Sequence, residues 1–326
     1  MDIVLPPRLS LAMLPTPVAP LQRLSDRLGG PLISVKRDDL TGCDLSGNKV
    51  RKLEYLLAEA REQRATVVLT CGGVQSNHAR ATAVAARRLG IDSHLILRGD
   101  EPPVADGNLL LDRMVGASVE FITPAEWKDR SSILQRAADR LASDGARPYI
   151  IPEGGSNGLG SWGYISMLTE LLDENGRIPY SRIVCATGSG GTLAGLLLGR
   201  HILELDIDVT AVNVCDSAAY FRGRVREIVD DFNGRHETDI AIKDNEYEIL
   251  GGFKGPGYAI PFDEEIAVIK DVARTEGLFL DPVYTGKAFL GMVEGVRRGR
   301  FDSKDHLLFL HSGGIFGLIA QREAFQ

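Results

Sequence analysis

Short apolar runs alternate with longer helical patterns along most of this chain. The strand-like runs cover residues 33–36, 67–70, 94–97, 118–122, 149–151, 183–186, 209–214, 278–280 and 307–310. The helical patterns cover residues 79–89, 124–143, 161–174, 192–203, 262–276 and 285–298. Because a helix that connects two parallel strands packs back onto the sheet, this alternation predicts an α/β fold with open parallel sheets flanked by helices. At 326 residues the chain is long enough for about two such domains.

Glycine is over-represented, with 36 glycines among 326 residues, where about 7% is usual. Most of the surplus lies where a strand-like run meets a helical pattern, with pairs at 72–73, 154–155, 190–191 and 313–314. Ligands of open parallel sheets bind beyond the carboxyl ends of the strands. Glycine at that edge lets the backbone approach a ligand closely. We therefore expect a binding site formed by these turns.

Charge and composition exclude several classes of protein. Lysine and arginine number 37 against 44 aspartate and glutamate, a net charge of −7 without a dense basic stretch, so we expect no nucleic-acid partner. No apolar run approaches the ~18 residues of a membrane span, so we expect no membrane association. The four cysteines are far apart and the six histidines lack ligand spacing. We expect no metal site, and the cysteines favour a reducing, cytoplasmic location.

The segment from Thr187 to Thr192 reads T-G-S-G-G-T, follows a strand-like run and opens a helix. Backbone N–H groups in such a turn converge on an anion, and the helix dipole favours negative charge there. The segment lacks the Gly-Lys-Ser/Thr of a P-loop, and Leu193 departs from the dinucleotide pattern. Phosphate binding is the favoured interpretation. A turn that only packs helix against sheet is an alternative, as is a nicotinamide dinucleotide site with Asp216 as ribose partner.

Lys49 falls in the first turn of a helix that opens at S-G-N-K. A helix N-terminus and the nearby Arg51 and Lys52 disfavour its ammonium form, so its pKa should fall. A lysine with a lowered pKa is suited to Schiff-base chemistry. Alone, Lys49 would be interpreted as a surface lysine, but together with a phosphate cup it indicates pyridoxal 5'-phosphate (PLP) as cofactor.

The turn Gln75-Ser76-Asn77-His78 places a hydroxyl, an amide and an imidazole at the start of the next helix. One interpretation is helix N-capping by Ser76 or Asn77. The other is a cradle for the carboxylate of an amino acid, formed with the helix N–H groups.

A competing hypothesis is a serine hydrolase. Residues 154–158 match G-x-S-x-G with Ser156 at the nucleophile position, between a strand-like run and a helix. Asp281 and either His306 or His311 follow in the order of hydrolase catalytic residues. However, no glycine-rich oxyanion loop precedes Ser156, so this remains an alternative.

Six motifs then occur in order: residues 36–39 (KRDD), 47–54 (GNKVRKLE), 75–78 (QSNH), 187–192 (TGSGGT), 255–258 (GPGY) and 280–287 (LDPVYTGK). Together they resemble the aminocyclopropane-carboxylate (ACC) deaminase / D-cysteine desulfhydrase family of PLP-dependent enzymes. The resemblance spans nearly the whole chain. It implies the tryptophan-synthase β-like fold (fold type II) and a homodimer. It also implies a large PLP-binding domain from residues 1–45 and 156–326 and a smaller inserted α/β domain from residues 46–155.

The resemblance also implies roles for single residues. Lys49 bonds covalently to PLP and, once freed by the substrate, removes the α-proton. The cofactor phosphate is held by Gly188, Ser189, Gly190, Gly191 and Thr192, with Lys52 assisting. Asn77 lies near the cofactor 3-hydroxyl.

On the substrate side, the resemblance places Ser76 near the carboxylate of a small amino acid. Gln75, Asn77 and His78 belong to the same substrate-binding turn. Tyr258 and Tyr284 face the reacting carbons, and Thr285 meets the pyridine nitrogen.

Two positions favour the desulfhydrase branch. ACC deaminases resemble one another in having glutamate after the second tyrosine and glutamine after Ser-Asn, where this chain has Thr285 and His78. A carboxylate would keep the ring nitrogen protonated, whereas a threonine can only hydrogen-bond to it. Opening a cyclopropane demands more electron withdrawal than β-elimination. We therefore expect conversion of D-cysteine to pyruvate, sulfide and ammonia. ACC deaminase, L-cysteate sulfo-lyase or another β-eliminating lyase, and a catalytically silent PLP-binding protein remain alternatives.

Overall fold

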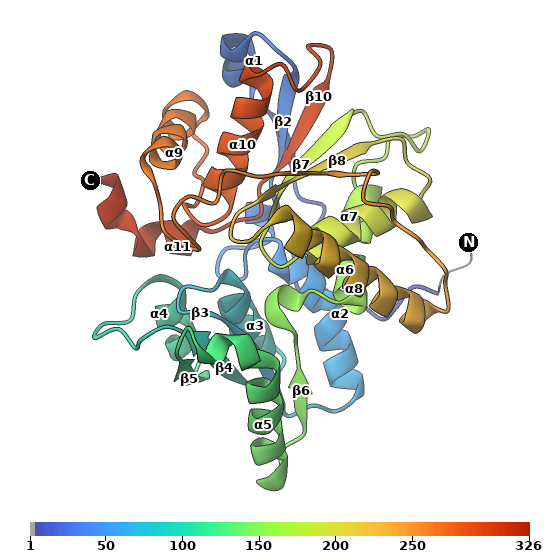
Figure 1. Ribbon diagram of the computed structural model, residues 1–326. Coiled ribbons are helices and arrows are strands. Elements are labelled where there is room, and N and C mark those ends of the chain that lie inside the picture. Colours follow the sequence, from blue (N-terminus) through green and yellow to red (C-terminus); the bar gives the residue numbers. More distant parts are fainter. Residues whose placement is uncertain (1–3) are drawn as a thin grey trace.

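The computed structural model describes residues 4–326, which form two β-sheets (Figure 1). The strands of the large sheet are β1 (Val18–Pro20), β2 (Leu32–Lys36), β7 (Arg182–Thr187), β8 (Asp208–Asn213), β9 (Glu248–Leu250) and β10 (His306–Leu310). The strands of the small sheet are β3 (Val67–Gly73), β4 (Asp92–Arg98), β5 (Ser118–Ile122) and β6 (Pro148–Ile150). Their spatial orders are β1-β2-β10-β7-β8-β9 and β5-β4-β3-β6. Every pair is parallel except edge strand β1, which is antiparallel to β2, so the predicted fold class is confirmed.

Helices cover both faces of both sheets (Figure 1). On the large sheet, one face packs against α1 (Gln22–Leu28), α9 (Asp263–Glu276) and α10 (Thr285–Arg297), and the other against α6 (Gly158–Thr169), α7 (Gly191–Ile202) and α8 (Ala218–His236). On the small sheet, one face packs against α5 (Arg130–Ser143) and the other against α3 (Asn77–Arg88) and α4 (Gly107–Met114). A last helix, α11 (Ile315–Ala320), contacts α4, and short 3₁₀ turns lie at Asp38–Leu40, Glu126–Asp129, Glu153–Gly155 and Arg322–Phe325.

Helix α2 (Lys49–Glu62) joins the two sheets, because it packs against α6 on one side and α3 on the other. Its apolar residues Leu53 and Leu57 belong to one hydrophobic core that also contains Val68 of β3 and Leu196 of α7. The four strands of the small sheet all come from residues 67–150, between β2 and β7 of the large sheet. The division at residues 46 and 155 stays a prediction.

The structure corrects the predicted elements in a few places. Residues 278–280 form no strand. Leu278 and Leu280 are buried while Phe279 is 60% exposed, so the apolar run is an extended connection into α10. The helix predicted over 124–143 starts only at Arg130, after a 3₁₀ turn. Helix α8 was not predicted. Its buried side chains nevertheless recur at the spacing of an amphipathic helix. No helix within residues 4–326 is both long enough and apolar enough to cross a bilayer.

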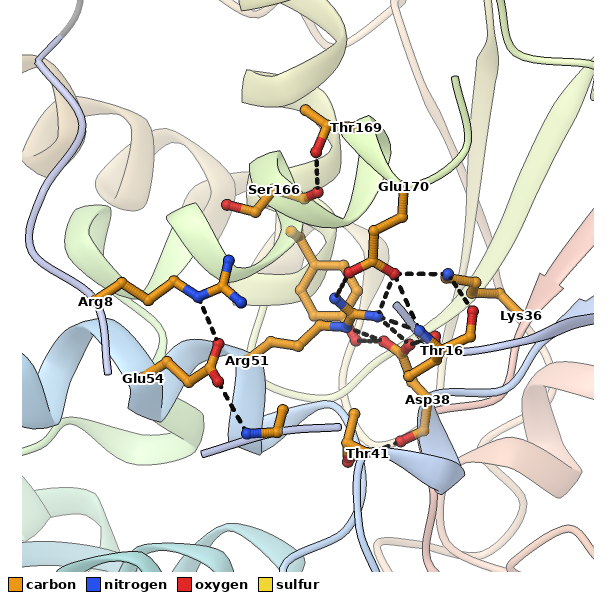
Figure 2. Close-up of polar contacts among 12 residues, drawn as sticks. Arg8, Thr16, Lys36, Asp38, Thr41, Arg51, Glu54, Ser166, Thr169 and Glu170 are labelled. Atoms are coloured by element: carbon orange, nitrogen blue, oxygen red, sulfur yellow. Dashed lines mark hydrogen bonds and ion pairs between the residues drawn. The ribbon is translucent and has the colours of Figure 1, made fainter. Parts of the chain in front are cut away.

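A buried network of charges fixes α2 in place (Figure 2). Arg51 donates from Nε and Nη2 to the two carboxylate oxygens of Asp38, at 2.8 Å each, and from Nη1 to Glu170 at 2.6 Å. Lys36 donates to Glu170 at 2.7 Å, and Tyr164 donates to Asp38 at 2.7 Å. The network therefore ties α2 to the end of β2 and to α6, and sets the position from which Lys49 projects.

Candidate active site

A cavity of about 330 Å³ lies between the two sheets, at the carboxyl ends of their strands. Gly73 at the end of β3 and Arg98 at the end of β4 line it from the small sheet. Thr187 at the end of β7 and Asp216 after β8 line it from the large sheet. This is the edge at which the glycine-rich turns predicted a binding site.

Most of the predicted site residues line this cavity. They are Lys49, Ser76, Asn77, His78, Gly188, Ser189, Gly190, Thr192, Tyr258 and Tyr284. Four others, Lys52, Gln75, Gly191 and Thr285, lie next to it without lining it. The fold thus brings together segments that are far apart in the sequence, while the individual roles stay predictions.

Lys49 is the first residue of α2 and projects into the cavity. Burial lowers the pKa of its amino group to about 8, against a smaller opposing effect of the Glu153 carboxylate. The direction agrees with the prediction, but the cause differs, because Arg51 points away from Lys49 into the carboxylates of Asp38 and Glu170. An amine with a pKa near 8 is partly neutral at physiological pH, which nucleophilic attack on an aldehyde requires.

Lys52 lies one turn further along α2, buried beneath the glycine loop. Its Nζ donates to the carbonyl of Gly154 at 3.3 Å and lies 3.5 Å from Ser156 Oγ. Burial, with the charge of Lys49, holds the pKa of Lys52 well below its usual value. The two lysines are therefore buried amines with few protein partners to stabilise a positive charge.

The loop from β7 to α7 forms a cradle that only glycine permits. Gly190 has φ +85°, and a Cβ on Gly191 would lie 2.5 Å from Ser156 Oγ and 2.8 Å from Lys52 Nζ. The first N–H groups of α7 have no acceptor within the helix. The buried hydroxyl of Thr187 also lacks a hydrogen-bond partner within residues 4–326. A phosphate group would supply acceptors for these donors, so the residues present fit the cofactor.

Helix α3 begins at the other side of the cavity. Ser76 caps it by accepting a hydrogen bond from the N–H of Ala79 at 3.1 Å, as the capping interpretation expected. Asn77 Oδ1 accepts from Asn108 at 3.0 Å, which directs the amide NH₂ of Asn77 elsewhere. His78 Nε2 lies 2.8 Å from the Thr70 hydroxyl. Burial and the charges of both lysines of α2 hold the pKa of His78 well below 6.5, so its imidazole is neutral.

Tyr258 and Tyr284 meet over the cavity, with 2.9 Å between their hydroxyl oxygens. Burial raises the pKa of Tyr258 to about 12 and that of Tyr284 well above 10. Both phenols are therefore neutral near pH 7 and one donates to the other, which leaves one O–H free to donate to a ligand.

Thr285 and Gln75 direct their side chains into the protein. The Thr285 hydroxyl donates to Asp281 at 2.6 Å and accepts from the Asp281 N–H at 2.7 Å. Gln75 accepts from the N–H of Asn108 at 2.8 Å and donates to the carbonyl of Asp106 at 2.9 Å. Their predicted contacts with the pyridine nitrogen and the substrate would require these bonds to change.

Sequence reasoning missed several residues that line the cavity, namely Asn48, Arg98, Trp127, Arg130, Glu153, Tyr220 and Ser312. The sequence could have indicated Arg98 and Glu153 as site residues, since each is a charged residue that follows a predicted strand closely. The approach of Trp127 and Arg130 depends on how the start of α5 packs, and no local pattern shows this.

The serine hydrolase alternative is wrong. Ser156 is buried and its hydroxyl pairs with that of Ser189 at 2.9 Å, not with a histidine. Asp281 accepts hydrogen bonds from the start of α10, His306 pairs with Ser34, and His311 with the carbonyl of Phe279. The three components of a catalytic triad are thus held in different places.

Comparison with known proteins agrees with this geometry. Residues 9–313 match the family described as "Pyridoxal-phosphate dependent enzyme". A Thermotoga maritima protein named "Putative 1-aminocyclopropane-1-carboxylate deaminase" is 47% identical over 315 residues, covering 96% of this chain and 98% of that protein. The Arabidopsis thaliana "Bifunctional D-cysteine desulfhydrase/1-aminocyclopropane-1-carboxylate deaminase, mitochondrial" is 43% identical, covering 95% and 78%. A crystal structure of an "ACC deaminase homologue" superposes with a TM-score of 0.90 at 35% identity, covering 98% and 95%. The chain therefore belongs to the PLP-dependent enzymes, in the family that contains ACC deaminases and D-cysteine desulfhydrases.

Proposed function

We propose that the protein is a lyase that eliminates the β-substituent of a small amino acid, with D-cysteine as substrate and pyruvate, sulfide and ammonia as products. The observation that supports this most directly is Lys49, an amine with a pKa of about 8 that faces the cavity opposite a glycine cradle. The name of the Arabidopsis relative includes this activity.

Bound PLP would supply an electron sink for the negative charge that develops when a substrate loses its α-proton. The N-terminus of α7, from Gly188 to Thr192, would hold the phosphate, with Lys52 beneath it. Lys49 would bind the cofactor covalently and, when released, accept the α-proton as general base.

The remaining residues would orient the substrate. The N–H groups at the start of α3, with the Ser76 hydroxyl, would bind the α-carboxylate, and the amide of Asn77 would donate to the cofactor 3-hydroxyl. The neutral hydroxyls of Tyr258 and Tyr284 would lie over the reacting carbons. They can donate a hydrogen bond there without adding charge.

The direct test is Lys49→Ala, compared with Lys52→Ala as a neighbouring lysine variant. The wild-type protein purified with PLP should absorb visible light and release keto acid from D-cysteine. Lys49→Ala should lose that absorption and at least about 10⁴-fold of the activity, the scale seen when a covalent catalytic group is removed. An unchanged visible spectrum in Lys49→Ala would refute the assignment of the cofactor lysine.

ACC deaminase is the second candidate, because the names of both relatives include it. Thr285 and His78, which are both uncharged here, favour β-elimination instead. A panel of D- and L-cysteine, L-cysteate and ACC, assayed for keto acid, separates the candidates. Combining Thr285→Glu with His78→Gln should shift the ratio of activities toward ACC, with Thr285→Ser as the control for the buried position. An unchanged ratio would contradict the assignment to the desulfhydrase branch.

We further propose a cytoplasmic homodimer. All four cysteines are free, which suits a reducing compartment. The N-terminal arm exposes the apolar side chains of Val4, Leu5 and Met13, which a second copy would cover. Light scattering should give twice the mass of one chain, and cell fractionation should place the protein in the cytosol. A monomer mass would refute the dimer.

A further inference from the structure

Arg98 is a cation that the proposed chemistry leaves without a role. It ends β4, and the parallel register places it directly beside Gly73 of β3, at the carboxyl edge of the small sheet. The helix that presents Ser76 and Asn77 starts a few residues beyond Gly73. Arg98 therefore lines the cavity next to the proposed binding site for the substrate carboxylate.

Two aromatic rings hold its guanidinium group. The central carbon of the Arg98 guanidinium lies 5.0 Å from the ring centroid of Tyr258 and 4.9 Å from that of Trp127. Stacking of this kind attracts a cation to the ring faces and fixes the plane of the guanidinium. The N–H groups at its edge remain available, because a ring face does not accept hydrogen bonds as an oxygen does.

The charge of Arg98 has no carboxylate partner among the described residues, unlike that of its neighbour. Arg130 also stacks on Trp127, at 5.1 Å, but its Nε donates to Glu153 at 2.9 Å. Asp216 lines the cavity too, yet it is exposed and accepts from the N–H of Ser217. A fixed, unpaired cation at a partly enclosed cavity attracts an anionic group of a ligand.

The other anionic groups expected in the cavity already have binding sites. The cofactor phosphate is assigned to the N-terminus of α7, which belongs to the large sheet. The substrate α-carboxylate is assigned to the N-terminus of α3. The β-substituent of the substrate is the group that still has no assigned binding site.

We propose that Arg98 is the counter-ion of the substrate's β-substituent, so that the cavity selects small amino acids whose β-substituent is anionic, a thiolate, a sulfonate or a carboxylate. This rests on the proposed function and adds the substrate class to it. In an α,β-elimination the Cβ–S bond breaks and its electron pair leaves with sulfur, as hydrosulfide from the protonated thiol or as sulfite from a sulfonate, while the α-proton passes to the base; a β-carboxylate binds without being eliminated. A cation fixed beside the departing group stabilises that charge without reorganising.

Binding of aspartate and asparagine to the PLP-bound enzyme tests the proposal. The two ligands have nearly the same shape and differ in charge at the β-substituent. Both enantiomers are titrated, and the dissociation constant is taken from the change in visible absorption. We expect the wild type to bind aspartate about tenfold or more tightly than asparagine, as for a charged hydrogen-bonded pair. Arg98→Gln should abolish this preference, and Arg98→Lys should keep part of it.

Arg222→Gln is the matched control. Arg222 stacks on Tyr247 at 4.9 Å but lies outside the cavity, so its removal should leave the preference for aspartate unchanged. Turnover of D-cysteine and L-cysteate by the same variants then shows whether a thiolate or a sulfonate depends more on Arg98. A larger loss of kcat/KM for either of them than for β-chloroalanine supports the assignment.

Several results would overturn it. Equal losses of affinity for aspartate and asparagine in Arg98→Gln would assign Arg98 to the α-carboxylate instead. Equal affinity of the wild type for aspartate and asparagine would refute the proposal, even if D-cysteine is turned over. A protein that shows no visible absorption with PLP would refute the proposed function itself, and this inference with it.

Discussion

Helix α2 carries basic side chains on two of its sides, and only one of these sides faces carboxylates that pair with them. On one side Arg51 is completely buried and meets two carboxylates, Asp38 and Glu170 (Figure 2). On the other side Lys49 and Lys52 lie beside the cavity and the glycine loop, where neither forms an ion pair within residues 4–326. Lys49 and Arg51 are two positions apart in the sequence, yet their electrostatic surroundings differ strongly.

The same burial penalty has opposite outcomes on the two sides. Burial lowers the pKa of Arg51, but the charge of Asp38 and the hydrogen bonds that Arg51 donates to both carboxylates outweigh it and raise the pKa overall. Burial likewise dominates at Lys49, where the Glu153 carboxylate opposes it too weakly to prevent a pKa of about 8. On this helix carboxylates, rather than burial, therefore separate a structural cation from a reactive amine.

The largest expected effect is on stability, from Arg51→Met. This change leaves Asp38 buried without its counter-ion and should lower the free energy of unfolding by about 3–5 kcal/mol, as when one partner of a buried ion pair is removed. Glu170 keeps its bond from Lys36, so the loss should centre on Asp38. Urea unfolding monitored by circular dichroism measures it.

The pH dependence of that loss has a definite sign. In the wild type burial raises the pKa of Asp38, but Arg51 more than offsets this, so its stabilising contribution is complete above pH 3.8 and is lost only below it. In Arg51→Met only the hydrogen bonds from Tyr164 and Thr16 still oppose the effect of burial, so the pKa of the Asp38 carboxyl rises and it takes up a proton at higher pH. The difference from the wild type should therefore narrow as the pH falls from 7 toward 5. A constant difference would contradict this account.

The next largest expected effect is on the chemical reactivity of the Lys49 amine. In the cofactor-free protein, its modification by an amine-reactive reagent should rise with pH to a midpoint near 8. At pH 7 its neutral fraction would be about 300 times that of a lysine at the ordinary value of 10.5. Peptide mass spectrometry across pH 6–10 follows the modification, with the exposed Lys304 as internal standard for the reagent. A midpoint near 10 would show that the cavity does not depress the pKa of Lys49.

Lys52→Met should have a smaller effect on the free energy of unfolding than Arg51→Met, and of the opposite sign. The pKa of Lys52 is depressed in the folded state, so the unfolded chain binds more protons between that value and 10.5. Replacing this buried amine with an apolar side chain should leave the cofactor-free protein equally stable or more stable by about 1 kcal/mol at pH 7. The gain should shrink as the pH rises toward 10.5. A loss as large as that of Arg51→Met would show that Lys52 has a stabilising partner.

The sequence predicted well the features that depend on local pattern. Apolar runs locate eight of the ten strands within residues 4–326, because a buried parallel strand must be apolar on both faces, and they miss the three-residue edge strands β1 and β9. The exception at 278–280 shows the limit, since three residues can be apolar for a connection as well as for a strand. The start of α2 at Lys49 and the glycine turn before α7 were readable for the same local reason.

What could not be predicted depends on packing between distant segments. Arg98 becomes part of the cavity through its register beside Gly73 and its stacking on Tyr258 and Trp127, contacts across long stretches of sequence. Thr285 falls in the expected segment, yet its hydroxyl is directed by Asp281. The sequence motifs therefore located the segments of the site, whereas side-chain direction required the tertiary structure.

The smallest expected effect is on the pKa of Lys49, through the Glu153 carboxylate. Glu153 raises the pKa of Lys49, but Arg130 holds its carboxylate at 2.9 Å and partly cancels its charge. Glu153→Gln should therefore move the midpoint of Lys49 modification below 8, by about half a pH unit. Asp216→Asn is the matched control, because Asp216 lines the same cavity without contributing to the pKa of Lys49. If both variants shift the midpoint equally, the cavity acts through its total charge. If only Glu153→Gln shifts it, a single carboxylate that Arg130 partly neutralises sets how reactive Lys49 is, whereas Arg51 on the other side of α2 is paired with two carboxylates.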